Sequence, residues 1–272
     1  MISYDPKNWI GILLDFPRSP IFRTLIVDVI GAGAWAALVV WLEVDVLHVL
    51  IPLGPAFLSN LGIILGLLLV FRTNTAYDRW WEGRRLWGQL VNVSRGLARQ
   101  LAGAPPERRA RYGFLLCEFP SLLAVHLRRP TGVGGPHLPG GLLSELHAEV
   151  RADVADGTLG PDARLTLAPL LQQFDDVMGA CERIRNTPIP FSYSSYVKQF
   201  VMLYALIMPF GLVKEFGYGT VIACMLTFFA TMGLELLAGE IEEPFGTDNN
   251  DLPLDDLAAV IARDVRVALE SR

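Results

Sequence analysis

The sequence predicts an all-α integral membrane protein with four transmembrane helices in two hairpins and a helical cytoplasmic domain between the hairpins. Two observations predict this class. Of the 272 residues, 52% are hydrophobic and 19% are charged, whereas a soluble domain carries about 25% charged residues. Long apolar stretches lie in two groups, and no stretch of useful length alternates as a half-buried strand does. The net charge of −5 does not suggest nucleic-acid binding.

Each group of apolar stretches is expected to form a helical hairpin. A membrane helix needs about 20 mostly apolar residues. Residues 25–42 and 49–71 meet or nearly meet this requirement, as do residues 197–213 and 219–238. Only short linkers join the two members of each pair, so the second helix of a pair must return across the membrane.

Positive charge places the region between the hairpins in the cytoplasm, because loops rich in lysine and arginine stay inside. This region holds most of the arginines, and Lys7, Arg18 and Arg23 place the N-terminus on the same side. The linker at residues 43–45 is acidic and fits the outside, with Lys214 in the other linker as a minor exception. We expect a multi-pass protein of the inner (plasma) membrane with both termini in the cytoplasm.

Five segments follow from this topology. They are an N-terminal interfacial segment at 1–24, a first hairpin with the long second helix at 25–71, a cytoplasmic helical domain at 72–192, a second hairpin at 193–238 and a cytoplasmic C-terminal segment at 239–272. The N-terminal segment lacks the apolar core of a signal peptide. Its expected form is a short amphipathic helix on the membrane surface, with an apolar face of Trp9, Ile10, Leu13 and Phe16.

The cytoplasmic domain is predicted to consist of helices. Apolar residues recur at helical spacing over residues 107–126, 142–155 and 161–186, and residues 128–141 form a loop rich in proline and glycine. The core candidates of the last helix are Leu165, Leu167, Leu170, Leu171 and Phe174.

The second helix is predicted to continue far beyond the membrane. No helix breaker follows Phe71 until Pro105, so one helix is expected over residues 56–101. At 1.5 Å per residue such a helix is roughly 70 Å long, whereas the hydrocarbon core is about 30 Å thick. A helix that leaves the membrane and enters a soluble domain suits a channel wall better than a lipid anchor.

One face of this helix carries three apolar residues at a spacing of four. Ile63, Leu67 and Phe71 share that face, and Gly62 and Gly66 have the small-xxx-small spacing of closely approaching helices. Two interpretations are open. The three residues are ordinary packing residues, or they form rings around a symmetry axis and make a constriction that excludes water.

Three motifs occur in order along the chain. Residues 71–88 read FRTNTAYDRWWEGRRLWG, residues 188–193 read PIPFSY, and residues 242–251 read EEPFGTDNND. The first closely resembles the FRTNxxYxRWWEgRklWG signature of the bacterial and plastid branch of the bestrophin ion channels. The second resembles the segment before the third span of that family, and the third resembles its PFG-acidic segment.

This resemblance implies a homopentamer around one axial pore. Carried onto this sequence, the narrow neck of the pore consists of Ile63, Leu67 and Phe71, and a second constriction at the cytoplasmic exit is Ile189. Family necks often have Ile or Phe at the middle position, so Leu67 departs from the pattern. It remains apolar, and a neck that works by excluding water keeps its character.

Four polar residues are further candidates for the pore or for contacts between subunits. Asp28 and Glu235 lie within apolar spans, where ionisable residues usually face protein or water. Arg72 and Asn74 follow the neck directly. They either belong to a structural belt of ion pairs or, where they meet the pore, favour anions.

The acidic segment is a weak candidate for a calcium site. Asp248 and Asp251 are its only acids between residues 247 and 251, whereas animal bestrophins have a nearly continuous acidic run, and Ca²⁺ prefers six to eight oxygen ligands. A turn in which Asp and Asn bind backbone amides is the favoured alternative. Neither the histidines nor the three cysteines show metal-ligand spacing, so we expect no cofactor.

The function expected from these features is passive flow of small monovalent ions through a neck that opens and closes. The acidic outer linker and the net charge lean slightly toward cations, and the arginines below the neck lean toward anions such as chloride. An enzyme is not expected, because no convergent catalytic residues appear. A non-conducting membrane scaffold is a distant alternative. The expected partners are further copies of the chain, monovalent ions and membrane lipids.

Overall fold

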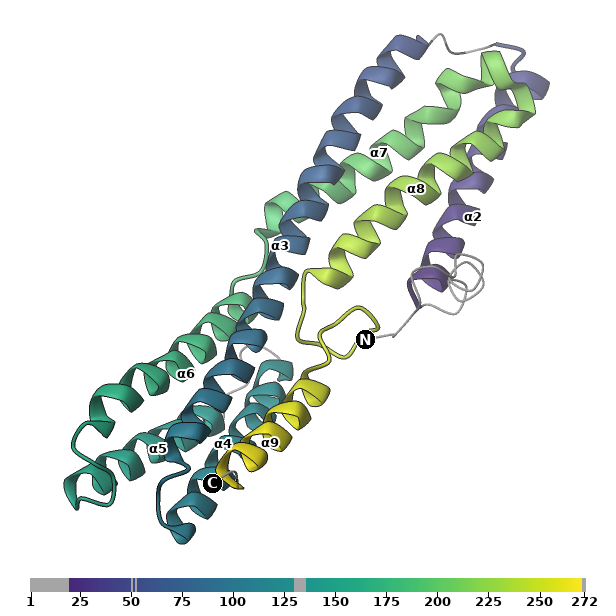
Figure 1. The fold of residues 1–272 in the computed structure, drawn as a ribbon. Coiled ribbons are helices and arrows are strands. Elements are labelled where there is room, and N and C mark those ends of the chain that lie inside the picture. Colours follow the sequence, from purple (N-terminus) through teal and green to yellow (C-terminus); the bar gives the residue numbers. More distant parts are fainter. Residues whose placement is uncertain (1–19, 50, 52, 130–135, 271–272) are drawn as a thin grey trace. The chain divides into compact units, whose positions relative to one another are not determined.

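The computed structural model describes residues 20–49, 51, 53–129 and 136–270, and the regular secondary structure of this part of the chain is entirely helical (Figure 1). The amphipathic segment predicted around Trp9 lies outside the described residues. The elements are α2 (Pro20–Trp41), the π-helix η2 (Leu42–Val46), α3 (Pro55–Leu101), α4 (Pro106–Arg128), α5 (Leu138–Ala155), α6 (Ala163–Asn186), α7 (Phe191–Phe216), the 3₁₀ turn η3 (Gly217–Gly219), α8 (Thr220–Ile241) and α9 (Leu254–Glu270).

The chain folds into two compact units. One consists of residues 20–78 and 189–242 and contains α2, the first part of α3, α7 and α8; we call it the membrane unit. The other consists of residues 79–188 and 243–270 and contains the rest of α3 with α4, α5, α6 and α9; we call it the polar unit. Helix α3 therefore contributes to both units, and its bounds confirm the long helix predicted over residues 56–101.

Three helical stretches among the described residues are long and apolar enough to cross a membrane. They are Ile21–Val46, Pro55–Leu101 and Phe191–Ile241. The third contains α7 and α8, which lie side by side and are joined at Gly217 (Figure 1). Gly217 has φ 50°, a backbone conformation that other residues rarely adopt, and this allows the chain to end α7 and reverse.

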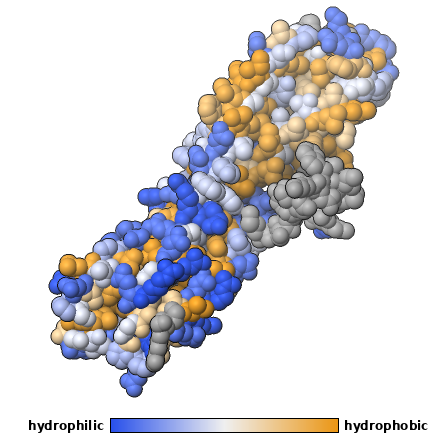
Figure 2. Space-filling model, viewed as in Figure 1, coloured by the Kyte–Doolittle hydropathy of each residue, from blue (hydrophilic) through white to orange (hydrophobic). Residues whose placement is uncertain are grey.

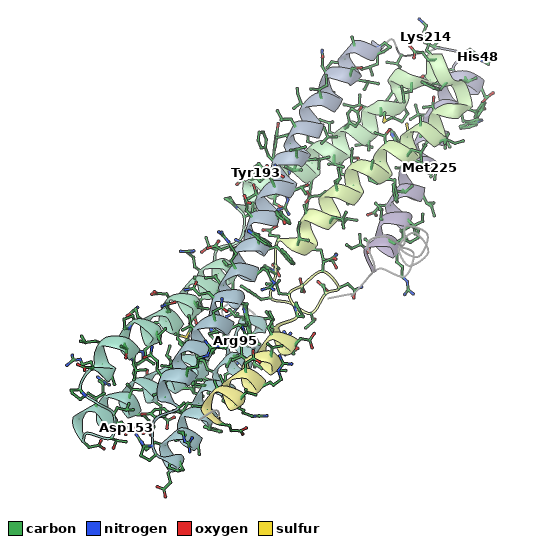
Figure 3. The ribbon with its side chains drawn as sticks, viewed as in Figure 1. His48, Arg95, Asp153, Tyr193, Lys214 and Met225 are labelled. Atoms are coloured by element: carbon green, nitrogen blue, oxygen red, sulfur yellow. The ribbon has the colours of Figure 1, made fainter. Side chains whose placement is uncertain are left out.

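Close helix contacts hold the membrane unit together. Helix α2 packs against α7 and α8, and the indole N–H of Trp35 donates to the backbone oxygen of Leu206 at 3.1 Å. A side chain on Gly33 would lie 2.8 Å from Sδ of Met225, whose position on α8 is labelled in Figure 3. The larger of two buried clusters in this unit consists of Leu25, Val29, Leu65, Leu69, Val197, Val201 and Phe228.

The membrane unit also presents apolar side chains on its outside. Figure 2 shows hydrophobic residues over much of the visible surface of its helices, and hydrophilic residues over much of the visible surface of the polar unit. Exposed residues of the membrane unit include Val27, Ile30, Ile222 and Leu226. A surface of this kind is suited to lipid or to other protein chains rather than to water.

The polar unit has its own aromatic and aliphatic core. Trp87, Tyr112, Phe119 and Phe174 are fully buried there, with α4 packed against α5, α6 and α9. Two sequence expectations are wrong in this unit. Leu165, expected in the core, is 75% exposed, because it lies in the first turn of α6 and points away from the face that carries Leu167, Leu171 and Phe174. Residues 138–141, expected in the loop, belong to α5, where Pro139 is tolerated in the first turn.

Candidate ion pathway and its buried charges

Helix α3 has an apolar face that is largely exposed within the chain. Ile63 is 71% exposed, and Leu67 and Phe71 are each 55% exposed. Leu65 and Leu69, which alternate with them along the helix, are buried in the core of the membrane unit. The three predicted neck residues therefore do not fill the interior of the chain, and their role in a neck stays a prediction.

The two glycines beside this face differ in their surroundings. A side chain on Gly62 would lie 3.0 Å from the hydroxyl oxygen of Tyr204, so Gly62 allows α7 to approach α3. A side chain on Gly66 would have no atom within 4 Å. Gly66 is exposed, like Ile63 and Leu67, and leaves room for close approach by a further helix from outside the chain.

Arg72 is buried at the end of this apolar stretch and is neutralised by two carboxylates. Its side chain is 1% exposed. Nη2 donates to Oε2 of Glu242 at 2.7 Å, and Nε lies 3.4 Å from Oε2 of Glu235, which is also 1% exposed. Of the two roles expected for Arg72, this geometry favours the structural ion pair. Asn74, by contrast, is exposed, and Asp28 is half-buried.

Lys198 completes a set of four charges that sum to zero. Its Nζ lies 3.9 Å from Oε1 of Glu235, and the lysine side chain is largely exposed. Isolated charges are costly to bury, but their cost falls when each charge faces an opposite one. Arg72 lies on α3, Lys198 on α7 and Glu235 on α8, so this cluster ties three helices of the membrane unit together.

Ile189, the predicted exit constriction, is bound to the same cluster through its backbone. Its N–H donates to Oε1 of Glu242 at 3.0 Å, and its side chain is 7% exposed. Pro188 and Pro190 flank it and restrict the backbone before α7 begins. Glu242 thus uses one carboxylate oxygen for Arg72 and the other for Ile189.

All three motifs found in the sequence meet in the membrane unit, and the first and third also meet in the polar unit. In the membrane unit, Arg72, Ile189 and Glu242 supply one residue from each motif. In the polar unit, the indole N–H of Trp80 donates to the backbone oxygen of Asn250 at 2.9 Å, and a side chain on Gly83 would lie 3.1 Å from Phe245. Their contacts explain why these residues occur together in one sequence.

The acidic segment forms a closed turn in the polar unit. The N–H of Asp248 donates to Oδ2 of buried Asp251 at 2.6 Å, and the N–H of Asp251 donates to the backbone oxygen of Asp248 at 3.1 Å. The structure adds Asp255 and Asp256 to the same cavity, but Arg128 pairs with Asp255 at 2.8 Å. These bonds fit the turn expected as the alternative, and the calcium site at Asp248 and Asp251 stays a prediction.

A second group of residues that could hold a metal was missed by spacing alone. His126, His137 and Glu182 lie together in the polar unit, and both Nε2 atoms contact Oε1 of Glu182, at 2.9 and 2.5 Å. The Nδ1 atom of His137 accepts the N–H of Gly140 at 3.0 Å, so in the neutral ring its Nε2 carries the proton. A metal ion at Nε2 needs that nitrogen unprotonated, which moves the proton of the neutral ring to Nδ1. Nδ1 could then no longer accept the N–H of Gly140, so metal binding would break this helix-capping bond.

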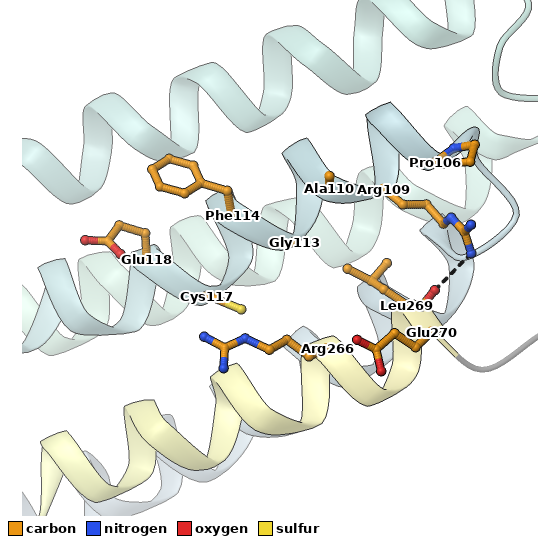
Figure 4. Close-up of a pocket in the computed structure, with 10 residues that line it drawn as sticks. All are labelled: Pro106, Arg109, Ala110, Gly113, Phe114, Cys117, Glu118, Arg266, Leu269 and Glu270. Carbon is orange, nitrogen blue, oxygen red and sulfur yellow. Dashed lines mark hydrogen bonds between the residues drawn. The ribbon is translucent and has the colours of Figure 1, made fainter.

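A cavity of ≈ 620 Å³ lies between α4 and α9 in the polar unit (Figure 4). Arg109 donates to the backbone oxygen of Leu269 at 3.2 Å at one end. Burial raises the pKa of the Cys117 thiol, which lines the cavity. Arg266, Glu118 and Glu270 place charges of both signs around it, so the lining does not select one class of ligand.

The helices and apolar spans define an all-helical membrane protein, and comparison with known proteins gives its family. The model of the bacterial and fungal bestrophin proteins matches residues 1–267. The chain belongs to the bestrophin family.

Solved structures and curated relatives agree with this assignment. A bacterial bestrophin homologue from Klebsiella pneumoniae superposes with a TM-score of 0.81 at 28% identity, covering 91% of this chain and 99% of that one. A voltage-dependent anion channel-forming protein of Nostoc sp. is 34% identical, covering 95% of this chain and 91% of the relative. A protein with the same description from Ralstonia nicotianae is also 34% identical, covering 98% and 94%. Membership of a channel family points away from an enzyme.

Proposed function

We propose that the chain is one subunit of a passive ion channel, a homopentamer whose axial pore is lined by the exposed face of α3. The observation that carries this proposal is the exposure of Ile63, Leu67 and Phe71 on a helix whose alternate residues are buried. Family membership supports it, because the curated relatives carry channel names. Such a channel needs no cofactor.

In the proposed topology the chain crosses the inner (plasma) membrane four times, and both termini lie in the cytoplasm. A single helix over residues 191–241 would be roughly 77 Å long, far more than the hydrocarbon core of about 30 Å. Because α7 and α8 lie side by side, two passes account for this stretch. The arginine-rich polar unit then lies in the cytoplasm, as positive charge favours.

The neck controls flow through its apolar character. Consecutive members of the series Ile63, Leu67 and Phe71 are about 6 Å apart along the helix, so five copies stack three apolar rings over about 12 Å. Water is unstable in a narrow apolar tube, and an ion that loses its water meets a barrier unless the tube widens. Ile189 forms a second constriction in this proposal on the family resemblance alone, since its side chain is 7% exposed within one subunit.

Anions are the first candidate for the permeant ion. The observation in favour is the name of the curated relatives, which describes them as forming anion channels. Chloride is the simplest such ion. The neck residues are uncharged and fit either sign.

Cations are the second candidate. Arg72, which would have favoured anions in the pore, is buried and balanced by Glu235 and Glu242. This removes one argument for anions and leaves the slight lean of the acidic composition, with its net charge of −5, toward cations.

Recording from purified protein in a planar bilayer under a salt gradient tests the function and the ion sign together. A channel gives discrete current steps, and the reversal potential moves toward the equilibrium potential of the permeant ion. We expect current steps whose reversal potential lies close to the equilibrium potential of the anion. A reversal potential close to the equilibrium potential of the cation would replace the first candidate by the second. The absence of current steps from intact oligomers would favour a non-conducting scaffold.

A further inference from the structure

The carboxylate of Glu242 occupies an unusual place in the membrane unit. It follows directly on α8, which ends at Ile241, and it contacts two segments distant in the sequence. Oε2 accepts from the guanidinium of Arg72, one residue beyond the last neck residue Phe71. Oε1 accepts the backbone N–H of Ile189. One side chain therefore bonds both to the end of the neck and to the exit residue.

The bond to Oε1 fixes the backbone of Ile189, whose side chain is buried. Pro188 and Pro190 on either side lack an N–H, so the N–H of Ile189 is the only backbone donor in that tripeptide. Hydrogen bonds to a charged acceptor are about twice as strong as neutral ones. Arg72 cannot easily move away, because its guanidinium also faces Glu235 and is buried.

We propose that Glu242 is a positioning residue that holds the exit constriction at Ile189 in register with the neck helix through Arg72. This inference rests on the proposed channel function. Glu242 does not meet the ion. It acts through Ile189, whose backbone it holds, so a change at Glu242 alters the constriction that each open channel presents.

The test compares single-channel permeability ratios of Glu242→Gln, Ile189→Ala and the double variant. Glutamine keeps an oxygen that can accept the N–H of Ile189 but removes the charge that binds Arg72. Glu243→Gln is the matched control, since it makes the same change one residue later and, among the described residues, the Glu243 side chain makes no hydrogen bond or ion pair. The mass of each purified oligomer is measured first.

We expect Glu242→Gln to change the permeability ratio about twofold or more in the direction of Ile189→Ala, because the backbone of Ile189 is then no longer tied to Arg72 through a charged group, and residues in one hydrogen-bond network are coupled. The double variant should change it by less than the product of the two single effects. Glu243→Gln should retain the parental ratio. A purely structural role would lower the number of assembled channels and leave the ratio of each channel unchanged.

Other outcomes separate the inference from the proposed function. If Ile189→Ala changes the ratio and assembled Glu242→Gln does not, the inference is wrong and the channel stands. If neither variant changes the permeability ratio, Ile189 is no constriction and the inference is wrong, whereas the channel stands because the parent conducts. If Glu242→Gln does not assemble, Glu242→Asp replaces it: it keeps the charge but is too short to reach both partners, and a parental ratio in that variant overturns the inference.

Discussion

Neighbouring residues of α3 have opposite environments within one helical turn. Leu65 and Leu69 are buried against α2, α7 and α8, whereas Leu67 between them is 55% exposed. The sequence of this stretch consists almost entirely of Leu, Ile and Gly, so periodicity could not separate packing residues from residues that face outward. The fold makes that separation, because it places the partners of Leu65 and Leu69 on one side of the helix.

Truncating these leucines should therefore have two different effects. Leu69→Ala removes buried methyl groups and should lower the free energy of unfolding by about 2–5 kcal/mol, with a lower yield of folded chain. Leu67→Ala leaves no cavity inside the chain and should leave the stability of the isolated subunit near that of the parent. Thermal unfolding of the solubilised protein measures the difference. Equal losses for the two variants would place Leu67 in the core.

Arg72 and Glu235 were both identified from sequence as candidates, but their pairing was not. Their partners lie far along the chain: Glu242 is 170 residues from Arg72. Within α3, Glu82 lies three residues from both Arg79 and Arg85, a spacing at which side chains of one helix can pair. The structure pairs Glu82 with Arg183 instead, at 2.6 Å. Ion pairs between distant segments are set by the tertiary fold, so no local pattern could have found them.

Cys181 should resist chemical modification in the folded protein. It is fully buried in the polar unit, and burial raises the pKa of its thiol to about 12. Since the thiolate is the reactive form, almost none is present at pH 8. We expect a maleimide or iodoacetamide reagent to label Cys181 only after denaturation, as read by peptide mass spectrometry. Rapid labelling of Cys181 in the native oligomer would contradict the packing of α6.

At the scale of the elements, the sequence predicted long helices better than their ends or their number. Helix α3 was predictable because no proline interrupts residues 56–101, and backbone hydrogen bonding then favours one continuous helix. Helix α9 was missed, although Leu254, Ala258, Ile261 and Val265 recur at helical spacing and are all buried. The start of α5 was missed because Pro139, Gly140 and Gly141 resemble a loop.

The contact between α2 and α8 depends on a small residue at Gly33. A side chain there would meet Sδ and Cγ of Met225 at 2.8 and 2.9 Å, so Gly33→Val should force α2 and α8 apart and lower the melting temperature. Gly31→Val is the matched control on the same helix, since a side chain at Gly31 has nothing within 4 Å. Similar melting temperatures for both valine variants would show that Met225 simply moves aside.

At the scale of the whole molecule, the fold class and family were predictable, and the assembly was not. The three motifs and the apolar spans identified the family, which the match over residues 1–267 confirms. A ring of subunits is a property of surfaces between chains. The exposed apolar residues of α3 fit such a surface, and no pattern within one chain sets the number of copies that meet on it. The neck and its five-fold symmetry therefore remain proposals.

The current through neck variants tests the central claim most directly. Ile63→Ala, Leu67→Ala and Phe71→Ala are purified, and the mass of each detergent-corrected particle is measured to confirm five chains. Each is then recorded in planar bilayers beside the parent. We expect every variant to conduct more than the parent, with the sign of the permeant ion little changed, because a wider apolar ring lowers the dehydration barrier. Pentamers that carry only the parental current would show that the pore lies on another face of α3.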